Sequence, residues 1–177
     1  YTEDRLTDMG GYRKEAIVQK TRTKSRYLQN EWKNNQWGIL IGGRLDKHNL
    51  VKNAIFSPRA NLRFDPTPNV NLRLSYGQGF RAPQLFDENL HVDIAGGEYI
   101  VYERNPNLEE EKSHSFSASM DWYRRVGVTE LNLMVEGFYT RLLHPFATVS
   151  LLEDEGNGKT IKTTVNESGA TVYRFNL

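Results

Sequence analysis

The stretch "SPRANLRFDPTPNVNLRLSY", Ser57–Tyr76, holds two runs in which apolar and polar side chains alternate. In the first run Ala60, Leu62 and Phe64 share one parity, and arginine or asparagine stands between them. The second run repeats this scheme after the interruption "DPTPN". A period of two is typical of a β-strand, whereas a helix repeats every 3.6 residues. Proline fixes φ and lacks a backbone N–H, so the interruption predicts a turn and the stretch predicts a β-hairpin.

Two further hairpins follow the same pattern. One surrounds "NNQ" within residues 27–45, and the other surrounds "RRVG" within residues 113–139. The connections at the opposite ends, residues 89–112 and 142–169, are long and polar. The sequence therefore predicts an all-β, antiparallel, up-and-down sheet of about seven strands of membrane-spanning length. Short turns are expected at one end and long loops at the other.

The composition restricts the classes of function. The chain has 177 residues, a net charge of +1 and no cysteine. This balance gives no basic excess of the kind that nucleic-acid binders show, so no nucleic-acid partner is expected. The absence of cysteine excludes a disulfide framework and a cysteine metal site. A mean hydropathy of -0.65 resembles that of a soluble protein, but strands that alternate in a membrane β-barrel lower the mean in the same way.

The sorting of side chains distinguishes two readings of the sheet. A soluble antiparallel sheet alternates too, with its apolar face on a core, and a β-sandwich binding module, for example for carbohydrate, is the alternative interpretation. The aromatic residues, however, gather at the strand ends on the apolar parity: Trp32, Trp37, Phe64, Tyr76, Trp122 and Tyr139. Arginine and glutamate fall on the opposite parity at Arg59, Arg63, Arg73 and Glu136. Aromatic girdles and a charge-free lipid face predict a transmembrane β-barrel wall.

Motifs for catalysis or cofactor binding are weak. "EGNGKT" lacks the first glycine of a phosphate-binding loop. The histidines have no metal-ligand spacing: His48, His91, His114 and His144. No G-x-S-x-G motif and no cysteine nucleophile is present. We therefore expect no catalytic residue, no metal site, no cofactor and no enzymatic activity.

Four segments carry a resemblance to a known family. "YLQNEWK" (Tyr27–Lys33) with "GGRLDKH" (Gly42–His48) resembles a strand pair of TonB-dependent outer-membrane receptors. The opening stretch, extended to "GQGFRAPQL", is similar to the barrel signature of that family. "NPNLEEEKS" (Asn105–Ser113) and "EGFYTR" (Glu136–Arg141) are similar to the segments that follow it. Glu110 departs from the pattern, since the family has proline there.

The resemblance implies a fragment of the C-terminal β-barrel domain. Residues 1–177 are expected to form part of one β-barrel domain, with the plug domain and the remaining strands absent from this chain, because such transporters have about 22 strands. The implied location is the bacterial cell outer membrane, with the short turns facing the periplasm. The implied partners are membrane lipid, a transported small-molecule ligand, and the TonB complex through the plug domain. The implied function is import of a siderophore, haem, cobalamin or oligosaccharide.

The resemblance also places the long loops on the ligand side. Aromatic and basic side chains there suit the carboxylates of a siderophore or haem. The expected ligand-binding residues are Arg81, His91, Tyr99, Tyr102 and Arg104. A structural barrel without transport is a further alternative that the sequence leaves open.

Overall fold

The computed structural model is built from β-strands joined by turns and loops. It describes residues 1–8, 17–83, 99–103, 105–154 and 159–177, and gives the backbone alone at residues 6, 8, 17–19, 99–103, 152–154 and 159. Within these ranges no residue is helical, and no helix could therefore cross a membrane. The prediction of an all-β chain is confirmed.

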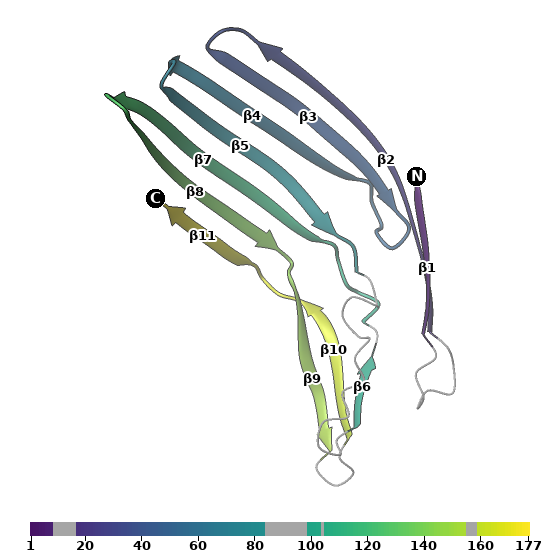
Figure 1. The fold of residues 1–177 in the computed structure, drawn as a ribbon. Helices are drawn as coiled ribbons and strands as arrows, with labels where there is room; N and C mark the ends of the chain where they lie inside the picture. Colours follow the sequence, from purple (N-terminus) through teal and green to yellow (C-terminus); the bar gives the residue numbers. More distant parts are fainter. Residues whose placement is uncertain (9–16, 84–98, 104, 155–158) are drawn as a thin grey trace.

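Eight strands form the main sheet, in the order β1-β2-β3-β4-β5-β7-β8-β11, and each pairs antiparallel with its neighbours (Figure 1). Their bounds are β1 Thr2–Asp8, β2 Ile17–Lys33, β3 Trp37–His48, β4 Ile55–Thr67, β5 Val70–Arg81, β7 Glu111–Val126, β8 Thr129–Leu143 and β11 Ala170–Asn176. Strand β4 has 13 residues, β7 has 16 and β8 has 15, which exceeds the roughly 9–11 that a tilted membrane strand needs.

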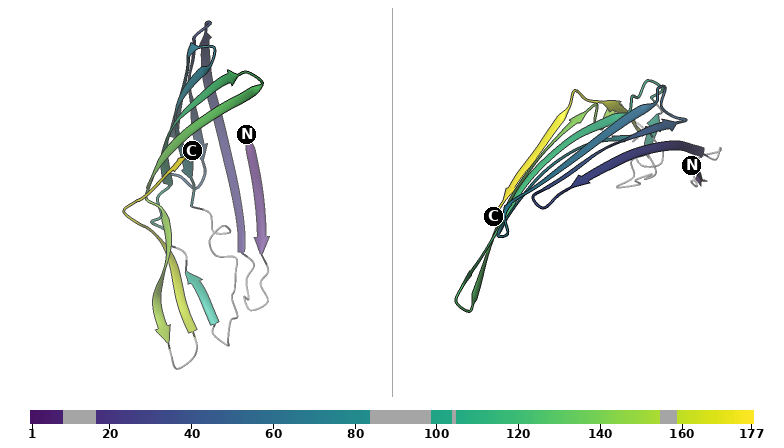
Figure 2. Two further views of the ribbon diagram at one scale, coloured as in Figure 1. Left: turned by 60° about the vertical axis from the view of Figure 1, so that its left-hand side comes forward. Right: turned by 90° about the horizontal axis from the view of Figure 1, so that it is seen from above.

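The main sheet curves into an open arc (Figure 2). Its edges are β1 and β11, which do not pair with each other, so the sheet is not closed. Strand β1 pairs only with residues 17–23 of β2, which leaves one side of residues 24–33 without a described neighbour. Six strands, β2, β3, β4, β5, β7 and β8, have 12 residues or more and can span a membrane, whereas β1 and β11 have seven residues each; the sequence predicted about seven.

Short turns join the strands at one end, here called the turn end. The β2–β3 turn is the predicted "NNQ", in which the Asn34 side-chain oxygen accepts hydrogen bonds from the backbone N–H groups of Gln36 (2.9 Å) and Trp37 (2.7 Å). This local bonding explains why asparagine begins the turn. The opposite end of the sheet, with the long connections, is called the loop end.

Two predicted turns are shorter than the sequence suggested. In "RRVG" the first three residues belong to β7, and the turn is Gly127–Val128, where Gly127 has φ +63°. In "DPTPN" the first three residues belong to β4, and only Pro68–Asn69 turn. A register shift between Phe64 and Thr67 explains how Pro66 fits a strand, because a bulge needs no ladder hydrogen bond from it.

One face of the main sheet, the apolar face, carries side chains that are not covered by any other layer. Leu74 is 53% exposed and Phe116 is 50% exposed. Cross-strand partners on this face pair apolar with apolar, as in Leu62 with Leu74 and Trp37 with Phe64. The rings of Trp37 and Phe64 stack with centroids 4.1 Å apart. An apolar surface this continuous and this exposed argues against a soluble sandwich, which would bury it.

The buried apolar core is correspondingly small. Among the described side chains, the buried hydrophobic residues are Val51, Ile55 and Ala82, with Phe80 packed against them. They lie at the loop end, where the β3–β4 connection meets the end of β5. The sheet is therefore held by its backbone ladder and not by a second layer.

A second, three-stranded sheet extends beyond the loop end (Figure 1). It consists of β6 (Tyr99–Glu103), β9 (Phe146–Asp154) and β10 (Lys159–Asn166) in the order β6-β10-β9. Strands β9 and β10 pair antiparallel, whereas β6 pairs parallel to β10. The sequence predicted long loops here with weak alternation, and the structure shows that they contain strands.

Candidate functional site

The other face of the main sheet, the polar face, carries a charged network near the turn end. The guanidinium of Arg63 lies 2.8 Å from the Asp65 carboxylate, and Asn71 donates a hydrogen bond to the same carboxylate. Arg73, which pairs with Arg63 across the strands, lies 3.9 Å from the Asp121 carboxylate. Each arginine thus has a carboxylate beside it, which makes this part of the wall charged and compatible with water or a polar partner.

Small side chains follow on the polar face toward the loop end. Gly77 pairs with Ser115, and Gly79 pairs with Ser113. A Cβ atom at Gly77 would meet no heavy atom within 4 Å, so the wall is open there. The Ser115 hydroxyl lies 3.0 Å from that of Thr140, which satisfies both groups within the wall. This part of the polar face leaves room for another molecule or segment to approach the backbone.

Two further arginines on the polar face border a recess of about 400 Å³. Arg44 donates from Nε to the buried Asp46 at 2.7 Å, and Arg59 donates to the side-chain oxygen of Gln29. The hydroxyl oxygen of Ser57 is buried here without a hydrogen-bond partner in the described part of the chain. The guanidinium N–H groups of Arg44 and Arg59 that are not used in these contacts can donate hydrogen bonds to an anionic group. The sequence parity had placed Arg59 on this face, but nothing in it linked Arg59 to Arg44.

At the loop end, Arg81 joins three strands. It is the last residue of β5, and its guanidinium lies 3.9 Å from the Glu111 carboxylate at the start of β7. The same guanidinium stands 4.8 Å from the ring centroid of Phe146 at the start of β9. The backbone N–H of Phe146 donates to the Glu111 carboxylate at 3.2 Å. Arg81 remains 46% exposed, so it is held in place and still reachable by a ligand.

The other predicted ligand-binding residues lie in or near the second sheet. Tyr99 and Tyr102 belong to β6, where they pair with Lys159 and Lys162 of β10, and their side chains are not described. His91 and Arg104 lie outside the described residues. The structure therefore brings the two tyrosines onto one strand of the second sheet, beyond the loop end.

Asn166 attaches the second sheet to the segment before β7, a role that the sequence did not indicate. Its side-chain oxygen accepts from the N–H of Glu109 at 2.8 Å, and its amide donates to the carbonyls of Glu109 (3.1 Å) and His144 (2.8 Å). Asn105 donates to the carbonyl of Thr164 at 3.1 Å. These bonds fix where the second sheet leaves the main sheet.

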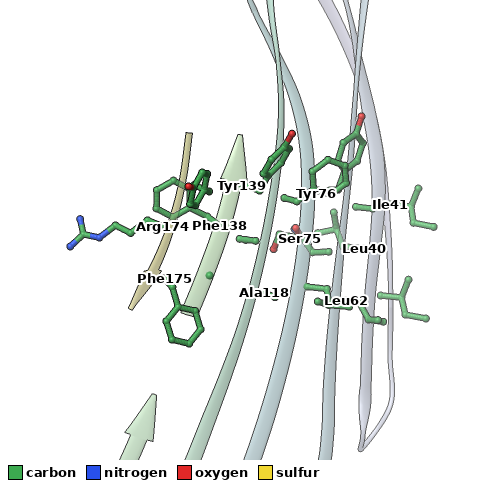
Figure 3. Close-up of a pocket in the computed structure, with 18 residues that line it drawn as sticks. Leu40, Ile41, Leu62, Ser75, Tyr76, Ala118, Phe138, Tyr139, Arg174 and Phe175 are labelled. Carbon is green, nitrogen blue, oxygen red and sulfur yellow. The ribbon is translucent and has the colours of Figure 1, made fainter. Parts of the chain in front are cut away.

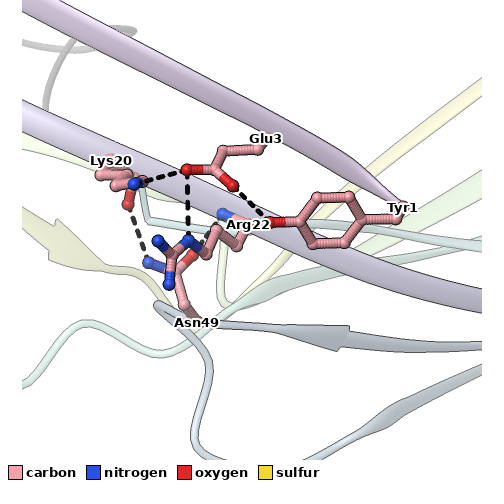
Figure 4. A network of polar contacts seen from close by, with 5 residues as sticks. All are labelled: Tyr1, Glu3, Lys20, Arg22 and Asn49. Atoms are coloured by element: carbon pink, nitrogen blue, oxygen red, sulfur yellow. Dashed lines mark hydrogen bonds and ion pairs between the residues drawn. The ribbon is translucent and has the colours of Figure 1, made fainter.

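The N-terminal strand is attached by a polar network at the same end (Figure 4). The Lys20 ammonium lies 2.5 Å from the Glu3 carboxylate, and Tyr1 donates to that carboxylate. The contact with Lys20, and then that with Tyr1, lowers the pKa of Glu3 to about 2. Asn49 in the β3–β4 connection accepts from the N–H of Arg22 and donates to the carbonyl of Lys20, both at 2.8 Å.

A shallow hollow of about 680 Å³ lies on the apolar face between the strand ends (Figure 3). Its lining includes Leu62, Leu74, Tyr76 and Tyr139, while Arg174 extends away from the other labelled side chains. This lining has almost no polar group with which to orient a ligand. We therefore place the candidate ligand site on the part of the polar face toward the loop end, away from the charged network at the turn end. In the described residues, no group of histidine and acidic side chains could hold a metal ion.

Comparison with known proteins agrees with this geometry. The family model described as "TonB dependent receptor-like, beta-barrel" matches residues 1–175. No curated protein sequence matches the chain.

Solved structures share the fold. The siderophore receptor PirA from Pseudomonas aeruginosa superposes with a TM-score of 0.72 at 19% identity, covering 89% of this chain and 31% of that one. The outer membrane transporter YddB from Escherichia coli gives a TM-score of 0.68 at 15% identity, covering 93% and 22%. A double mutant of the Serratia marcescens hemophore receptor HasR, in complex with its hemophore HasA and heme, gives 0.70 at 14% identity, covering 90% and 33%. The chain spans a third or less of each neighbour, and it belongs to the TonB-dependent receptor family as part of the β-barrel.

Proposed function

We propose that the natural protein containing this chain imports a scarce ligand across the bacterial outer membrane, with energy supplied through TonB. The observation that carries this proposal is the two-sided wall: an exposed apolar face bordered by aromatic rings, and a polar face lined with arginine, serine and glycine. One side of such a wall suits lipid and the other suits a water-filled or plugged lumen. Within that protein this chain supplies wall and loops, in one β-barrel domain whose plug and further strands belong to other parts of the sequence.

Iron-bearing ligands are the first candidates. Two of the three neighbours named above are a siderophore receptor and a hemophore receptor in complex with heme, whereas none of the three names cobalamin or oligosaccharide. Siderophores and haem carry carboxylate or other anionic oxygens, which arginine binds through paired hydrogen bonds. The exposed guanidinium of Arg81 and the Arg44–Arg59 recess offer such donors.

Ligand contact is proposed for Arg81, His91, Tyr99, Tyr102 and Arg104 on the outer side of the membrane. Arg81 supports this through its fixed but accessible guanidinium, and Tyr99 and Tyr102 through their shared strand. The short turns would then face the periplasm. Because the family is one of transport receptors, the ligand is expected to leave the protein chemically unchanged.

The test is uptake by whole cells. A strain lacking the gene is grown under iron limitation with one ferric siderophore or haem as the iron source, and uptake of the labelled ligand is measured. Complementation should restore uptake with wild-type protein but not when TonB is deleted. If uptake of every iron-bearing ligand is unchanged by the deletion while the protein is abundant in the outer membrane, iron import is wrong for this protein.

A matched pair of variants tests the ligand site. Arg81→Ala should weaken ligand binding by roughly ten-fold or more, because one charge-assisted contact is lost. Arg63→Ala, an exposed arginine on the same face near the turn end, serves as the control and should leave the dissociation constant unchanged. Equal affinity for both variants would remove Arg81 from the site.

A further inference from the structure

Four aromatic side chains form a continuous row across the apolar face. Tyr76, Phe116, Tyr139 and Tyr173 are direct cross-strand partners on β5, β7, β8 and β11. The rings of Tyr76 and Phe116 have centroids 4.8 Å apart. Tyrosine at a lipid-facing strand end marks the depth of the lipid headgroups. We call this set the aromatic row.

The next outward-facing positions toward the loop end form a second row, of polar residues. Gln78, His114, Arg141 and Thr171 are again direct cross-strand partners on the same four strands. Each lies two residues beyond the aromatic row, roughly 7 Å further along its strand. We call this set the polar row. Where the aromatic row has four rings, the polar row has four side chains that can donate hydrogen bonds to oxygen atoms.

The polar row carries positive charge that the protein does not neutralise. Arg141 is exposed and has no carboxylate within ion-pair distance among the described residues. The ring of His114 is held in place by the Tyr76 hydroxyl, 3.0 Å from its Nδ1. Lys112 lies on the same face, two residues from His114 toward the loop end of β7. Its ammonium forms an ion pair with the Glu110 carboxylate at 3.0 Å. Since these groups sit side by side, an anion at this position would meet several donors at once.

The same face at the turn end lacks this arrangement. Arg124 is the cation on β7 beyond Trp122, and its cross-strand partner is Leu131. The loop end of the apolar face, in contrast, also carries Lys24, Arg26 and Lys47 on β2 and β3. Positive charge on the lipid-facing surface is therefore concentrated at one of the two membrane boundaries.

We propose that the polar row, together with Lys112, binds the phosphate groups of anionic lipids in the leaflet at the loop end. Phosphate is the dense anion at headgroup depth, and arginine recognises it with paired donors. The row faces outward from the wall, so a ligand inside the barrel does not reach it. This inference rests on the proposed membrane location but is independent of which ligand is imported.

The experiment uses the natural full-length protein, purified from membranes in mild detergent. Native mass spectrometry measures retention of a lipid with a phosphate-monoester headgroup against phosphatidylcholine. The double variant His114→Gln, Arg141→Gln should lower the affinity for the anionic lipid by roughly ten-fold, because the charge-assisted contact of Arg141 and the ring contact of His114 are removed. The control Arg124→Gln, on the same strand and face at the turn end, should match wild type, as should phosphatidylcholine in all three proteins.

Three results would overturn the inference. The double variant could retain the anionic lipid as well as wild type does, or Arg124→Gln could lose as much. Alternatively, inorganic phosphate could displace the lipid at equal concentration, which would indicate a site for a free anion. Ligand uptake is measured separately on the same variants, so lipid binding without import would reject the proposed function and leave this inference standing.

Discussion

The two faces of the β4–β5 hairpin differ in chemistry although they alternate along one chain. On one face Leu62 pairs with Leu74, and on the other Arg63 pairs with Arg73. Leu74 is 53% exposed, so the apolar face is not covered by protein. In a soluble sheet the apolar face would be the buried one. The difference between the faces therefore points to two solvents, hydrocarbon on one side and a polar medium on the other.

The largest expected effect comes from placing a charge on each face in turn. Leu74→Arg should lower the free energy of unfolding by about 2–4 kcal/mol, because a cation near the middle of the lipid face loses its hydration. Ser75→Arg, one residue further along β5 on the polar face, is the control and should change it little. Urea titration of the natural protein in phospholipid vesicles measures both. Equal effects at the two positions would contradict the assignment of the faces.

A smaller effect is expected when a polar-face cation is removed. Arg73→Ala leaves the Asp121 carboxylate, only 11% exposed, without its nearest cation, and should cost about 1 kcal/mol, since the pair is 3.9 Å apart and Arg73 is 59% exposed. Arg124→Ala removes an exposed arginine at the turn end of the apolar face and should stay within about 0.5 kcal/mol of wild type. The same titration compares them. A cost at Arg124 that matched or exceeded that at Arg73 would show that Asp121 does not need its partner.

The stacked rings of Trp37 and Phe64 allow a comparison of two aromatic positions on the apolar face, one stacked and one not. Phe64→Ala removes the partner of Trp37 and should cost about 0.5–1.5 kcal/mol more than Phe56→Ala, which removes an exposed ring on the same strand and face. Thermal unfolding of the two variants gives this difference. No difference would mean that the ring stack adds nothing to burial in lipid.

The smallest effect concerns acid at the loop end. Because the pKa of Glu3 is lowered to about 2 from its ordinary 4.5, the attachment of β1 by Lys20 is fully present above pH 4.5. It is lost as the pH falls through about 2. Spin labels at Thr2→Cys and Thr23→Cys, a cross-strand pair, should therefore give a narrow distance distribution at neutral pH and a broader one in strong acid. Adding Glu3→Gln should remove this pH dependence.

Much of the main sheet could be predicted from the sequence because a period of two is a local property. The parity of Ala60, Leu62 and Phe64 was enough to orient the strand, and Asn34 was enough to locate a turn. Turn boundaries were predicted less well. Gly127 provides the positive φ that a two-residue turn needs, so the arginines before it could remain in β7.

The second sheet could not be predicted, because its pairing is not local. Strand β6 pairs in parallel with β10, more than fifty residues later in the chain, and no residue pattern encodes that partner. For the candidate site, the resemblance proposed Arg81 as a loop residue on the ligand side, but the sequence did not indicate its contacts with Glu111 and Phe146. Those contacts depend on where three strand ends meet in space.

Site-specific labelling tests the two-solvent account most directly, and the absence of cysteine from the chain makes single-cysteine variants simple to interpret. Cysteines at Leu62, Arg63, Leu74 and Ser75 are probed in the natural protein in vesicles, with one reagent dissolved in the hydrocarbon and one confined to water. We predict that the lipid-soluble reagent modifies positions 62 and 74 and spares 63 and 75. Modification of 63 and 75 from within the lipid, with 62 and 74 protected, would contradict the account.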